Sequence, residues 1–405
     1  MIRSSKVSTK FANANKQSNL KIFLKEYNRV SRLLVDELWE YESLPKFLSK
    51  DVTKKFDTWL SARMLQCIGK QIAGVVRGTK QKQKQRLFVI HKLQSENQTI
   101  KANKLQDIYD KTKVTKPNLD SVCPELDARF IKVDLHNNTS FNGWVTVSSI
   151  GNKMKLIFPF KKTVHLNRVL EDGKLKNGLR ITKNSFTFMI DLPDQPIKSD
   201  GTTLGLDIGQ TTLYSCSNNV TSVKNKHNHD LNSIQSRLAN AKKGSNGFRR
   251  SQQHRTNYIN WSINQLDLSA VKQLNLENIK HLRRNRKSSR KLSHWTYTDI
   301  KRKLESKCEQ QGVLVVYVSP TYTSQRCSHC GWVQKSNRKG KNFNCVSCSF
   351  AADADINASK NIALGLSSIG DGQRLQQNNR TGFFCRAVGD ERIVRHTKKT
   401  KRNRS

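Results

Sequence analysis

Acidic side chains are scarce in this chain of 405 residues, which has 31 aspartates and glutamates against 73 lysines and arginines. The resulting formal charge is +42 at pH 7. A folded protein with that much uncompensated charge repels itself unless a polyanion neutralises it, and nucleic acid is the usual polyanion. A membrane surface is the alternative, but it is usually matched by one concentrated basic helix or cluster. Because the basic residues here are spread along the chain, the charge favours a nucleic-acid partner.

Long apolar segments are lacking as well. Hydrophobic residues make up 35% of the sequence, which has neither a run of about 18 apolar residues nor an N-terminal signal-like segment. We therefore expect no membrane partner and a cytoplasmic location. The nine cysteines are an odd and mostly isolated set, which suits metal-bound thiolates in a reducing compartment better than a framework of disulfides.

The first half of the chain changes from a helical to an extended pattern. Residues 1–11 suit a short strand, and apolar side chains then recur at helical spacing over 20–41 and 56–75. We interpret both apolar stripes as the core of a helical bundle, and we expect the second helix to end at the basic run 79–86. From about residue 124 the apolar period becomes two, which predicts an antiparallel β-domain in the form of a small barrel.

The second half begins after "PDQPIKSDG" (193–201), which has the composition of a linker. A hairpin, "LGLDIGQTT" (204–212), is followed by a polar helical stretch over about 222–260 and a strand over 271–279. A helix that ends at Gly312 and a buried strand, "VLVVYVSP", come next. Six residues of an intervening basic loop are expected to contact nucleic-acid phosphates, with a solvated loop as the alternative: Arg283, Arg284, Arg286, Lys287, Arg290 and Lys291.

Two close cysteine pairs carry the strongest local signal. Each pair has the form C-x-x-C, and 14 residues separate the pairs. Four thiolates at this spacing suit tetrahedral Zn²⁺, and Gly331 permits a tight turn after the first pair. Because four protein ligands leave no open position, we predict a structural zinc ribbon and not a catalytic metal. The predicted zinc ligands are Cys327, Cys330, Cys345 and Cys348.

Three acidic residues of the second half have unusual surroundings. Asp207 lies within an apolar strand, where a charge is costly unless it faces a cation. Glu277 ends a second apolar strand, and Asp355 lies at the start of a helix just after the cysteines. Singly, each has an ordinary explanation, such as a turn or a helix N-cap. Together, three carboxylates that converge from distant segments are what a pair of Mg²⁺ ions requires for phosphodiester hydrolysis.

The order of these features resembles a known family. The segments that carry the resemblance are "GLDIG" (205–209), "LNLENIK" (274–280), "YTSQRCSHCG" (322–331) and "CVSCSFAADADINASKNIA" (345–363). Over about 200–365 the chain resembles the RuvC-like nuclease half of the TnpB proteins and of the compact type V CRISPR effectors. Two departures are mild. Ser349 stands where a glycine commonly follows the fourth cysteine, and "NASKNI" replaces the commoner "NAA-x-NI".

The resemblance implies an α+β multidomain fold, although in the N-terminal half only the order of the elements matches the family. The implied domains are an N-terminal β-barrel (wedge) domain over 1–14 and 124–198, interrupted by a helical recognition lobe over 15–123; an RNase H-like (RuvC) α/β nuclease domain over 199–322 and 351–385; a zinc ribbon inserted into it over 323–350; and a basic tail over 386–405.

The resemblance also implies an RNA-guided DNA endonuclease. A guide RNA would pair with one strand of a double-stranded DNA target, and the protein would associate with the nucleoid when bound to DNA. Asp207, Glu277 and Asp355 match the family's catalytic acids and Mg²⁺ ligands, with Asp353 as the alternative for the third acid. Of two expected ions, one lowers the pKa of the attacking water and the other stabilises the leaving 3′ oxygen. The sequence leaves monomer and homodimer open.

Two other functions compete with cleavage. A guided DNA-binding protein or transposition accessory factor of the same lineage would bind without cutting, but the presence of all three acids favours cutting. An ATPase of the actin and Hsp70 type also uses an Asp-x-Gly hairpin around its phosphates. That fold needs a second such hairpin, and none follows Gly209 in this sequence.

Overall fold

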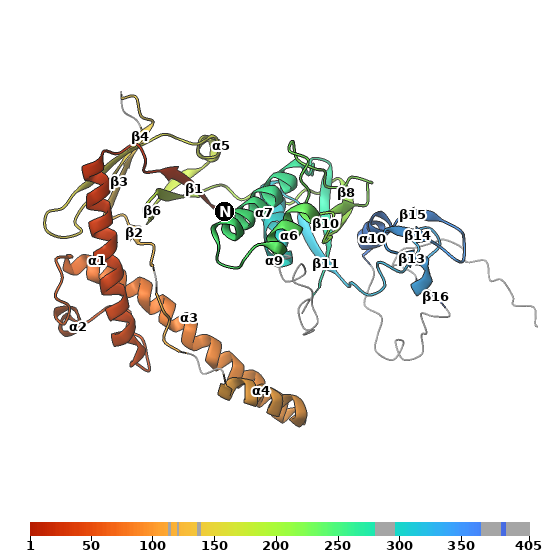
Figure 1. Ribbon diagram of the computed structural model, residues 1–405, viewed down its shortest axis with the longest axis horizontal. Helices are drawn as coiled ribbons and strands as arrows, with labels where there is room; N and C mark the ends of the chain where they lie inside the picture. Colours follow the sequence, from red (N-terminus) through yellow and green to blue (C-terminus); the bar gives the residue numbers. More distant parts are fainter. Residues whose placement is uncertain (112–114, 120, 136–138, 280–295, 366–381, 386–405) are drawn as a thin grey trace, which may run out of the picture. The chain divides into compact units, whose positions relative to one another are not determined.

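The computed structural model describes residues 1–111, 115–119, 121–135, 139–279, 296–365 and 382–385 (Figure 1). The chain divides into two compact units, Met1–Pro193 and Asp194–Ser405. Both contain helices and strands, so the expected α+β class is confirmed. Within the described ranges, no helix combines the length and the apolar character that crossing a membrane requires.

Two long helices pack together in the N-terminal unit. Its helices are α1 (Ala14–Trp39), α2 (Lys50–Lys54), α3 (Ala62–Ser95), α4 (Thr99–Lys111) and α5 (Val164–Asp172). Figure 1 shows α1 crossing α3, and the apolar stripes of the two helices share one core. The Tyr27 hydroxyl donates a hydrogen bond of 2.6 Å to Gln71 across this contact. Both helices begin at a side-chain N-cap, Asn13 for α1 and Ser61 for α3.

The second of these helices is longer than the sequence indicated. The expectation that it ends at the basic run 79–86 is wrong, because α3 continues through this run to Ser95. Lysine, glutamine and arginine are all good helix formers, which explains the continuation. The Lys80 amino group donates to the carbonyl oxygens of Trp39 (2.6 Å) and Tyr41 (2.7 Å), so it satisfies backbone acceptors at the end of α1.

The strands of the N-terminal unit form two antiparallel sheets. One has the order β1 (Ile2–Ser8), β7 (Ser185–Asp191), β6 (Lys174–Ile181), β2 (Glu125–Asp127), and the other has the order β3 (Ile131–Asp134), β4 (Gly143–Val147), β5 (Leu156–Phe160). β1 pairs with β7 over its whole length, from Ile2 opposite Asp191 to Ser8 opposite Ser185. In the sequence, helices α1–α4 are therefore inserted between β1 and β2, two strands of the same sheet.

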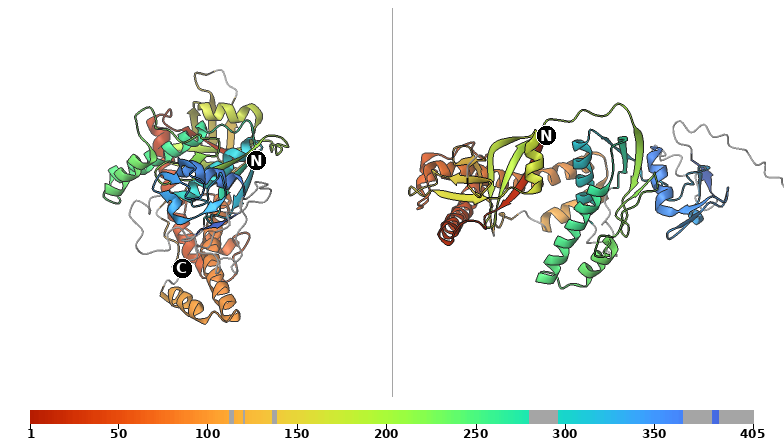
Figure 2. Two further views of the ribbon diagram at one scale, coloured as in Figure 1. Left: turned by 90° about the vertical axis from the view of Figure 1, so that its right-hand side faces the viewer. Right: turned by 90° about the horizontal axis from the view of Figure 1, so that it is seen from above.

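A mixed sheet organises the C-terminal unit. Its order is β11 (Leu314–Val318), β10 (Val271–Glu277), β8 (Thr202–Asp207), β9 (Ser215–Cys216). Strands β8, β10 and β11 run parallel, and β9 is antiparallel to β8. Helices α6 (Leu231–Asn240), α7 (Asn246–Gln265) and α9 (Tyr297–Gln310) contribute to the apolar core of the sheet. The polar stretch that was expected as one helical region is thus a hairpin of α6 and α7, visible in Figure 2.

Strand β11 is less buried than its apolar sequence suggested. Leu314 is 41% exposed and Tyr317 is 37% exposed, so the expectation of a fully buried strand is wrong. The reason is topological: β11 lies at the edge of the sheet and pairs only with β10 among the described strands. An apolar run looks the same in a sequence whether the strand is central or at an edge.

Helix α10 (Ala354–Ala363) is fixed directly against the mixed sheet. A Cβ atom at Gly205 of β8 would lie 2.1 Å from the Ser359 carbonyl oxygen, so only glycine permits this close approach of strand and helix. On the neighbouring strand β10, the Asn275 amide donates to the carbonyl oxygens of Ile362 (3.1 Å) and Ala363 (3.0 Å). These contacts set the position of α10 across β8 and β10.

Candidate functional site

Two of the predicted acids lie at the carboxyl ends of the two inner strands of the mixed sheet. Asp207 is the last residue of β8 and not, as the sequence suggested, in its middle; Glu277 is the last residue of β10. The two strands are parallel neighbours, with Leu206 opposite Leu276. Both acids therefore lie side by side at the carboxyl ends of the strands, which is where open α/β sheets bind ligands.

Helix α10 brings the third predicted acid to the same place. Asp355 is 6% exposed and lines a pocket of about 610 Å³ together with Asp207 and Glu277. Its alternative, Asp353, has a different role: the Asp353 carboxylate accepts hydrogen bonds from the backbone N–H groups of Asp355 (2.9 Å) and Ile356 (3.1 Å). Asp353 is thus the N-cap of α10, and it does not line the pocket.

Burial and like charge disfavour the ionised form of Asp207 in this pocket. Burial, followed by the nearby carboxylates of Glu277 and Asp355, raises the pKa of Asp207 from 3.8 to about 7, although Arg338 and Lys341 oppose the shift. Burial also raises the pKa of Glu277, against the lowering effects of its hydrogen bond from Thr323 and of the Arg338 charge. Carboxylate oxygens are preferred ligands of Mg²⁺, and a divalent cation would relieve this mutual repulsion. The donor set therefore fits Mg²⁺.

Two cations from a neighbouring hairpin pair with Asp355. The hairpin consists of β13 (Arg338–Lys339) and β14 (Asn342–Asn344), which continues to β15 (Ala351–Asp353). Arg338 donates to Asp355 at 2.8 Å, and Lys341 forms an ion pair with the other carboxylate oxygen and a 3.2 Å contact with the Thr212 hydroxyl. Sequence reasoning missed both residues, because no local pattern distinguishes them from the other basic residues of "SNRKGKN".

The four cysteines form a compact cluster. Their sulfur atoms all lie within 4.8 Å of one another, with Cys327 and Cys348 at 3.8 Å and Cys330 and Cys345 at 3.6 Å. A tetrahedral Zn²⁺ with Zn–S bonds of about 2.3 Å places its sulfurs about 3.8 Å apart, so the cluster fits zinc. Within the described ranges, it is the one group of at least three candidate ligands drawn together this closely. The three acids line one pocket but are not as close.

Backbone conformation around the cysteines explains two features of the sequence. Gly331, directly after the second cysteine, has φ +82°, as expected for a tight turn. Ser349, after the fourth cysteine, has φ +57°, a conformation that favours glycine and that explains why glycine is common there in the family. The first knuckle is covered by β16 (Phe383–Phe384), which pairs with β12 (Trp332–Val333) and stacks Phe384 edge-on against Trp332.

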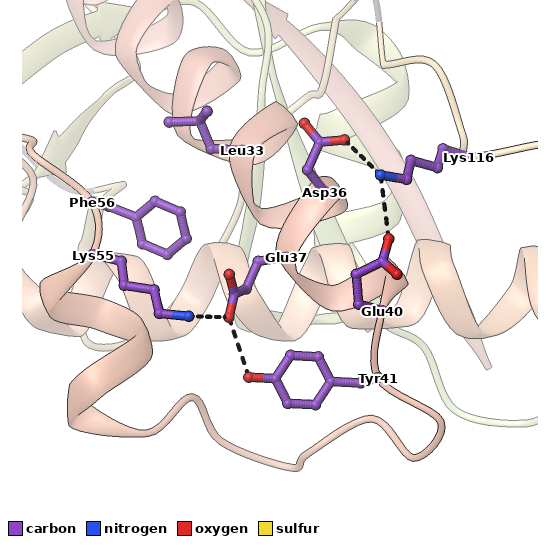
Figure 3. A pocket seen from close by; sticks show the side chains of 8 residues that line it. All are labelled: Leu33, Asp36, Glu37, Glu40, Tyr41, Lys55, Phe56 and Lys116. Atoms are coloured by element: carbon purple, nitrogen blue, oxygen red, sulfur yellow. Dashed lines mark hydrogen bonds and ion pairs between the residues drawn. The ribbon is translucent and has the colours of Figure 1, made fainter.

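A second acidic pocket belongs to the N-terminal unit and differs in kind (Figure 3). Two of its three carboxylates, Asp36 and Glu37, are on α1, the third, Glu40, is the C-cap of that helix, and all three are paired with lysines. Lys55 pairs with Glu37 at 2.8 Å, and Lys116 lies 3.4 Å from both Asp36 and Glu40. In Figure 3 the carboxylates of Asp36 and Glu40 both point toward Lys116, whereas the Glu37 carboxylate points toward Lys55 and Tyr41. These are surface ion pairs of the kind that contribute little to stability or binding.

Two basic segments lie outside the described residues: the loop with Arg283, Arg284, Arg286, Lys287, Arg290 and Lys291, and the tail over 386–405. The role of the loop in binding phosphates stays a prediction.

The four-cysteine cluster, followed by helix α10 with Asp355 in its first turn, is an arrangement found in a known family of domains. Residues 297–362 match the family model described as Cas12f1-like, TNB domain. The CRISPR-associated endodeoxyribonuclease Cas12f1 of Sulfoacidibacillus thermotolerans is 47% identical over 77 residues, which are 19% of this chain and 18% of the relative. A TnpB-like protein of Aquifex aeolicus is 32% identical over 89 residues, 20% of this chain and 29% of the relative.

These findings confirm the resemblance inferred from the sequence: the chain is related to the Cas12f1 and TnpB proteins and carries a Cas12f1-like TNB domain. The alignments cover less than a third of each curated relative. Among solved structures, a Cas12f1–sgRNA–target DNA complex aligns with 90% of this chain and 98% of its own, at 14% identity and a TM-score of 0.44.

Proposed function

We propose that the chain is an RNA-guided, Mg²⁺-dependent DNA endonuclease with a single RuvC-like site. The observation that carries the proposal is the convergence of Asp207, Glu277 and Asp355 on one pocket from β8, β10 and α10. Up to 148 residues separate these acids in the sequence. A purely structural origin does not account for three carboxylates at the carboxyl ends of parallel strands, where burial and the charges of Glu277 and Asp355 raise the pKa of Asp207.

The residues of the pocket have distinct parts in the proposed reaction. Two Mg²⁺ ions held by the three acids would lower the pKa of the attacking water and stabilise the leaving 3′ oxygen of a phosphodiester. Burial and the charges of the other two carboxylates raise the pKa of Asp207 to about 7, so Asp207 must lose its proton to act as a ligand. Glu277 receives a hydrogen bond from the Thr323 hydroxyl, which leaves its other oxygen for a cation.

The proposal that an RNA guides the protein to its DNA target rests on the net charge of the chain and on its similarity to Cas12f1 proteins. A formal charge of +42 suits a protein that holds a long RNA–DNA duplex by its backbone, and related Cas12f1 proteins are named endodeoxyribonucleases. We assign residues 1–14 and 124–198 to the wedge domain and 15–123 to the recognition lobe. The pairing of β1 with β7 around the inserted helices supports this division.

For the C-terminal unit we propose the remaining boundaries of the family layout. The nuclease domain would comprise 199–322 and 351–385, with the zinc ribbon over 323–350 inserted between them. The position of β10, β8 and α10 around the acids supports the nuclease assignment, and the four-sulfur geometry supports zinc in the ribbon. Guide RNA and double-stranded DNA are the proposed partners.

The test uses the protein purified with the RNA that accompanies it. The RNA is sequenced, a duplex that matches it is added with Mg²⁺, and cleavage is followed on a gel. We expect wild-type protein to cut. Mutation of a residue that hydrogen-bonds to a metal ligand lowers activity by up to about 100-fold, and we expect Asp355→Asn, which changes a ligand itself, to reduce the cleavage rate by more than that. Asp353→Asn is the matched control, because asparagine also caps helices and the site of change lies outside the pocket.

Two results would contradict the proposal. If Asp355→Asn cuts as well as Asp353→Asn, the three-acid site is not the catalytic site. If no RNA accompanies the protein and nuclease treatment leaves DNA binding intact, the guided part is wrong. Binding of matched DNA without cutting by the wild type, at any Mg²⁺ concentration, would instead support a guided DNA-binding protein.

A further inference from the structure

A buried polar network joins the carboxylate pocket to the cysteine ribbon. Its centre is Asn361 of α10, which is fully buried. The Asn361 amide nitrogen donates to the carbonyl oxygens of Thr323 (2.9 Å) and Arg326 (2.7 Å), and its oxygen accepts from the Arg326 guanidinium at 2.8 Å. Both amide hydrogens and the amide oxygen are therefore used, and no other residue type presents the same donors and acceptor at this length.

The network reaches a predicted catalytic acid through Thr323. This residue is 2% exposed, and its hydroxyl donates to the Glu277 carboxylate. Its carbonyl oxygen is the one that Asn361 holds. One short segment thus connects Glu277, on the sheet, to the helix that carries Asp355.

The other end of the network reaches the first cysteine knuckle. Asn357, also fully buried on α10, donates to the Arg326 carbonyl at 2.8 Å and accepts from the backbone N–H of Ser328 at 2.9 Å. Ser328 lies between Cys327 and Cys330. Arg326 has no exposed surface, and its guanidinium also donates to the Cys385 carbonyl at 2.7 Å. The asparagines of "INASKNI" therefore bind the ribbon to α10.

We propose that Thr323 and Asn361 are positioning residues of the metal site: Asn361 anchors the segment that precedes the first cysteine to α10, and Thr323 orients the Glu277 carboxylate toward the ligands on β8 and α10. This inference rests on the proposed function, since it assigns these residues to the Mg²⁺ pocket. Buried, fully bonded networks of this kind specify one geometry, and hydrogen-bond partners of metal ligands commonly set metal affinity.

The inference is tested by metal binding with no cleavage step. Mn²⁺ replaces Mg²⁺ as the probe, and free Mn²⁺ is measured by electron paramagnetic resonance with the full-length protein freed of nucleic acid in high salt. Thr323→Val keeps the shape of the side chain and removes the hydroxyl. We expect it to weaken Mn²⁺ binding by about 10- to 100-fold, and we expect Thr323→Ser, which keeps the hydroxyl, to restore it.

Asn361→Asp tests the anchor itself. Aspartate has nearly the same shape but cannot donate to the Thr323 and Arg326 carbonyls, so we expect a weakening similar to that of Thr323→Val. Ser359→Ala is the matched control: this buried hydroxyl of α10 donates only to Ile356 of its own helix, at 2.8 Å. Zinc content and the unfolding temperature are measured for each variant, and only variants that retain one zinc per chain are compared.

A kinetic measurement separates positioning from general damage. In the RNA complex, we expect Thr323→Val to raise the Mg²⁺ concentration for half-maximal cleavage while the rate at saturating Mg²⁺ stays close to that of wild type. The inference is overturned if Thr323→Val binds Mn²⁺ as tightly as wild type while Asp207→Asn does not. If Asp207→Asn also binds as tightly as wild type, the proposed function fails first, so the two failures are distinguishable.

Discussion

The cysteine cluster and the carboxylate pocket lie in the same unit but are built in opposite ways. The cysteines come from one stretch of 22 residues, 327–348, and their sulfur atoms lie within 4.8 Å of one another. The acids come from segments up to 148 residues apart, and Glu277 and Asp355 are held by Thr323 and by Arg338 with Lys341, respectively. A site with local ligands forms by its own hairpins, whereas a site with distant ligands depends on the elements that carry them.

The first prediction removes a ligand from the locally built site. Cys345→Ser should abolish zinc binding and unfold the ribbon, because structural zinc contributes an apparent free energy of about 10–16 kcal/mol in small zinc domains. Zinc per chain, measured by atomic absorption, should fall from one to zero, and near-ultraviolet circular dichroism should lose the signal of the ribbon. Cys123→Ser is the control, because Cys123 is exposed and outside the cluster. Retention of zinc by Cys345→Ser would contradict the four-thiolate site.

The second prediction has the opposite sign, because removal of an acid should stabilise the metal-free protein. The raised pKa of Asp207 means that its ionised form is unfavourable in the folded state, fully so above about pH 7 and not at all below its ordinary pKa of 3.8. Asp207→Asn should therefore raise the unfolding temperature at pH 8 by several degrees, at about 2–4 °C per kcal/mol for a unit of this size, and leave it unchanged at pH 4.

Differential scanning fluorimetry without added divalent ions checks this second prediction. Addition of Mn²⁺ should then raise the unfolding temperature of the wild type and have little effect on Asp207→Asn, because only the wild type retains the complete ligand set. A variant that is less stable than wild type at pH 8 would show that the acids do not repel one another in the folded protein.

The third prediction concerns the pH dependence of metal binding. Mn²⁺ can bind Asp207 only as the carboxylate, so below about pH 7 each ion must displace a proton. Affinity should fall by about tenfold per pH unit between pH 7 and pH 5 and level off above pH 7.5. Titrations followed by electron paramagnetic resonance give the profile directly. A constant affinity between pH 5 and pH 7 would mean that Asp207 is not a ligand.

The same contrast decides how much of each site the sequence could predict. The cysteine spacing alone predicts a four-ligand site, and Gly331 predicts its turn, because all of the determinants are within one stretch of 22 residues. The surroundings of the three acids, together with the family resemblance, predict them as a group, and the structure brings all three to one pocket. The choice of Asp355 over Asp353 depended on family position, and the N-cap geometry now gives the physical reason.

What the sequence could not predict are the contacts that hold the distant acids in place. The Thr323 hydroxyl bonds to Glu277, 46 residues earlier in the chain, and the Asn361 side chain bonds to Thr323, 38 residues earlier. No local sequence pattern predicts contacts at such distances. The exposure of β11 and the extent of α3 were missed for a related reason. An apolar run does not report its position in a sheet, and a run of lysine and glutamine suits both a helix and a loop.

The smallest expected effect concerns the ion pair between Lys341 and Asp355 in the carboxylate pocket. Lys341 forms an ion pair with one oxygen of the Asp355 carboxylate, so a divalent ion that uses this oxygen must displace the lysine. Lys341→Ala should therefore strengthen Mn²⁺ binding, by at most about fivefold, because partly exposed ion pairs contribute roughly 0.2–1 kcal/mol. Lys339→Ala is the matched control: it removes the same charge from the same hairpin at an exposed position that does not line the pocket.

The direction of this effect distinguishes two roles for Lys341. If the lysine competes with the metal, Lys341→Ala binds Mn²⁺ more tightly than Lys339→Ala, and the difference shrinks at high salt because the screened ion pair no longer opposes the ion. If the lysine instead helps to hold Asp355 in the pocket, Lys341→Ala binds Mn²⁺ more weakly than the control. The second result would mean that the hairpin of the ribbon helps to arrange the carboxylate pocket by holding Asp355 in place.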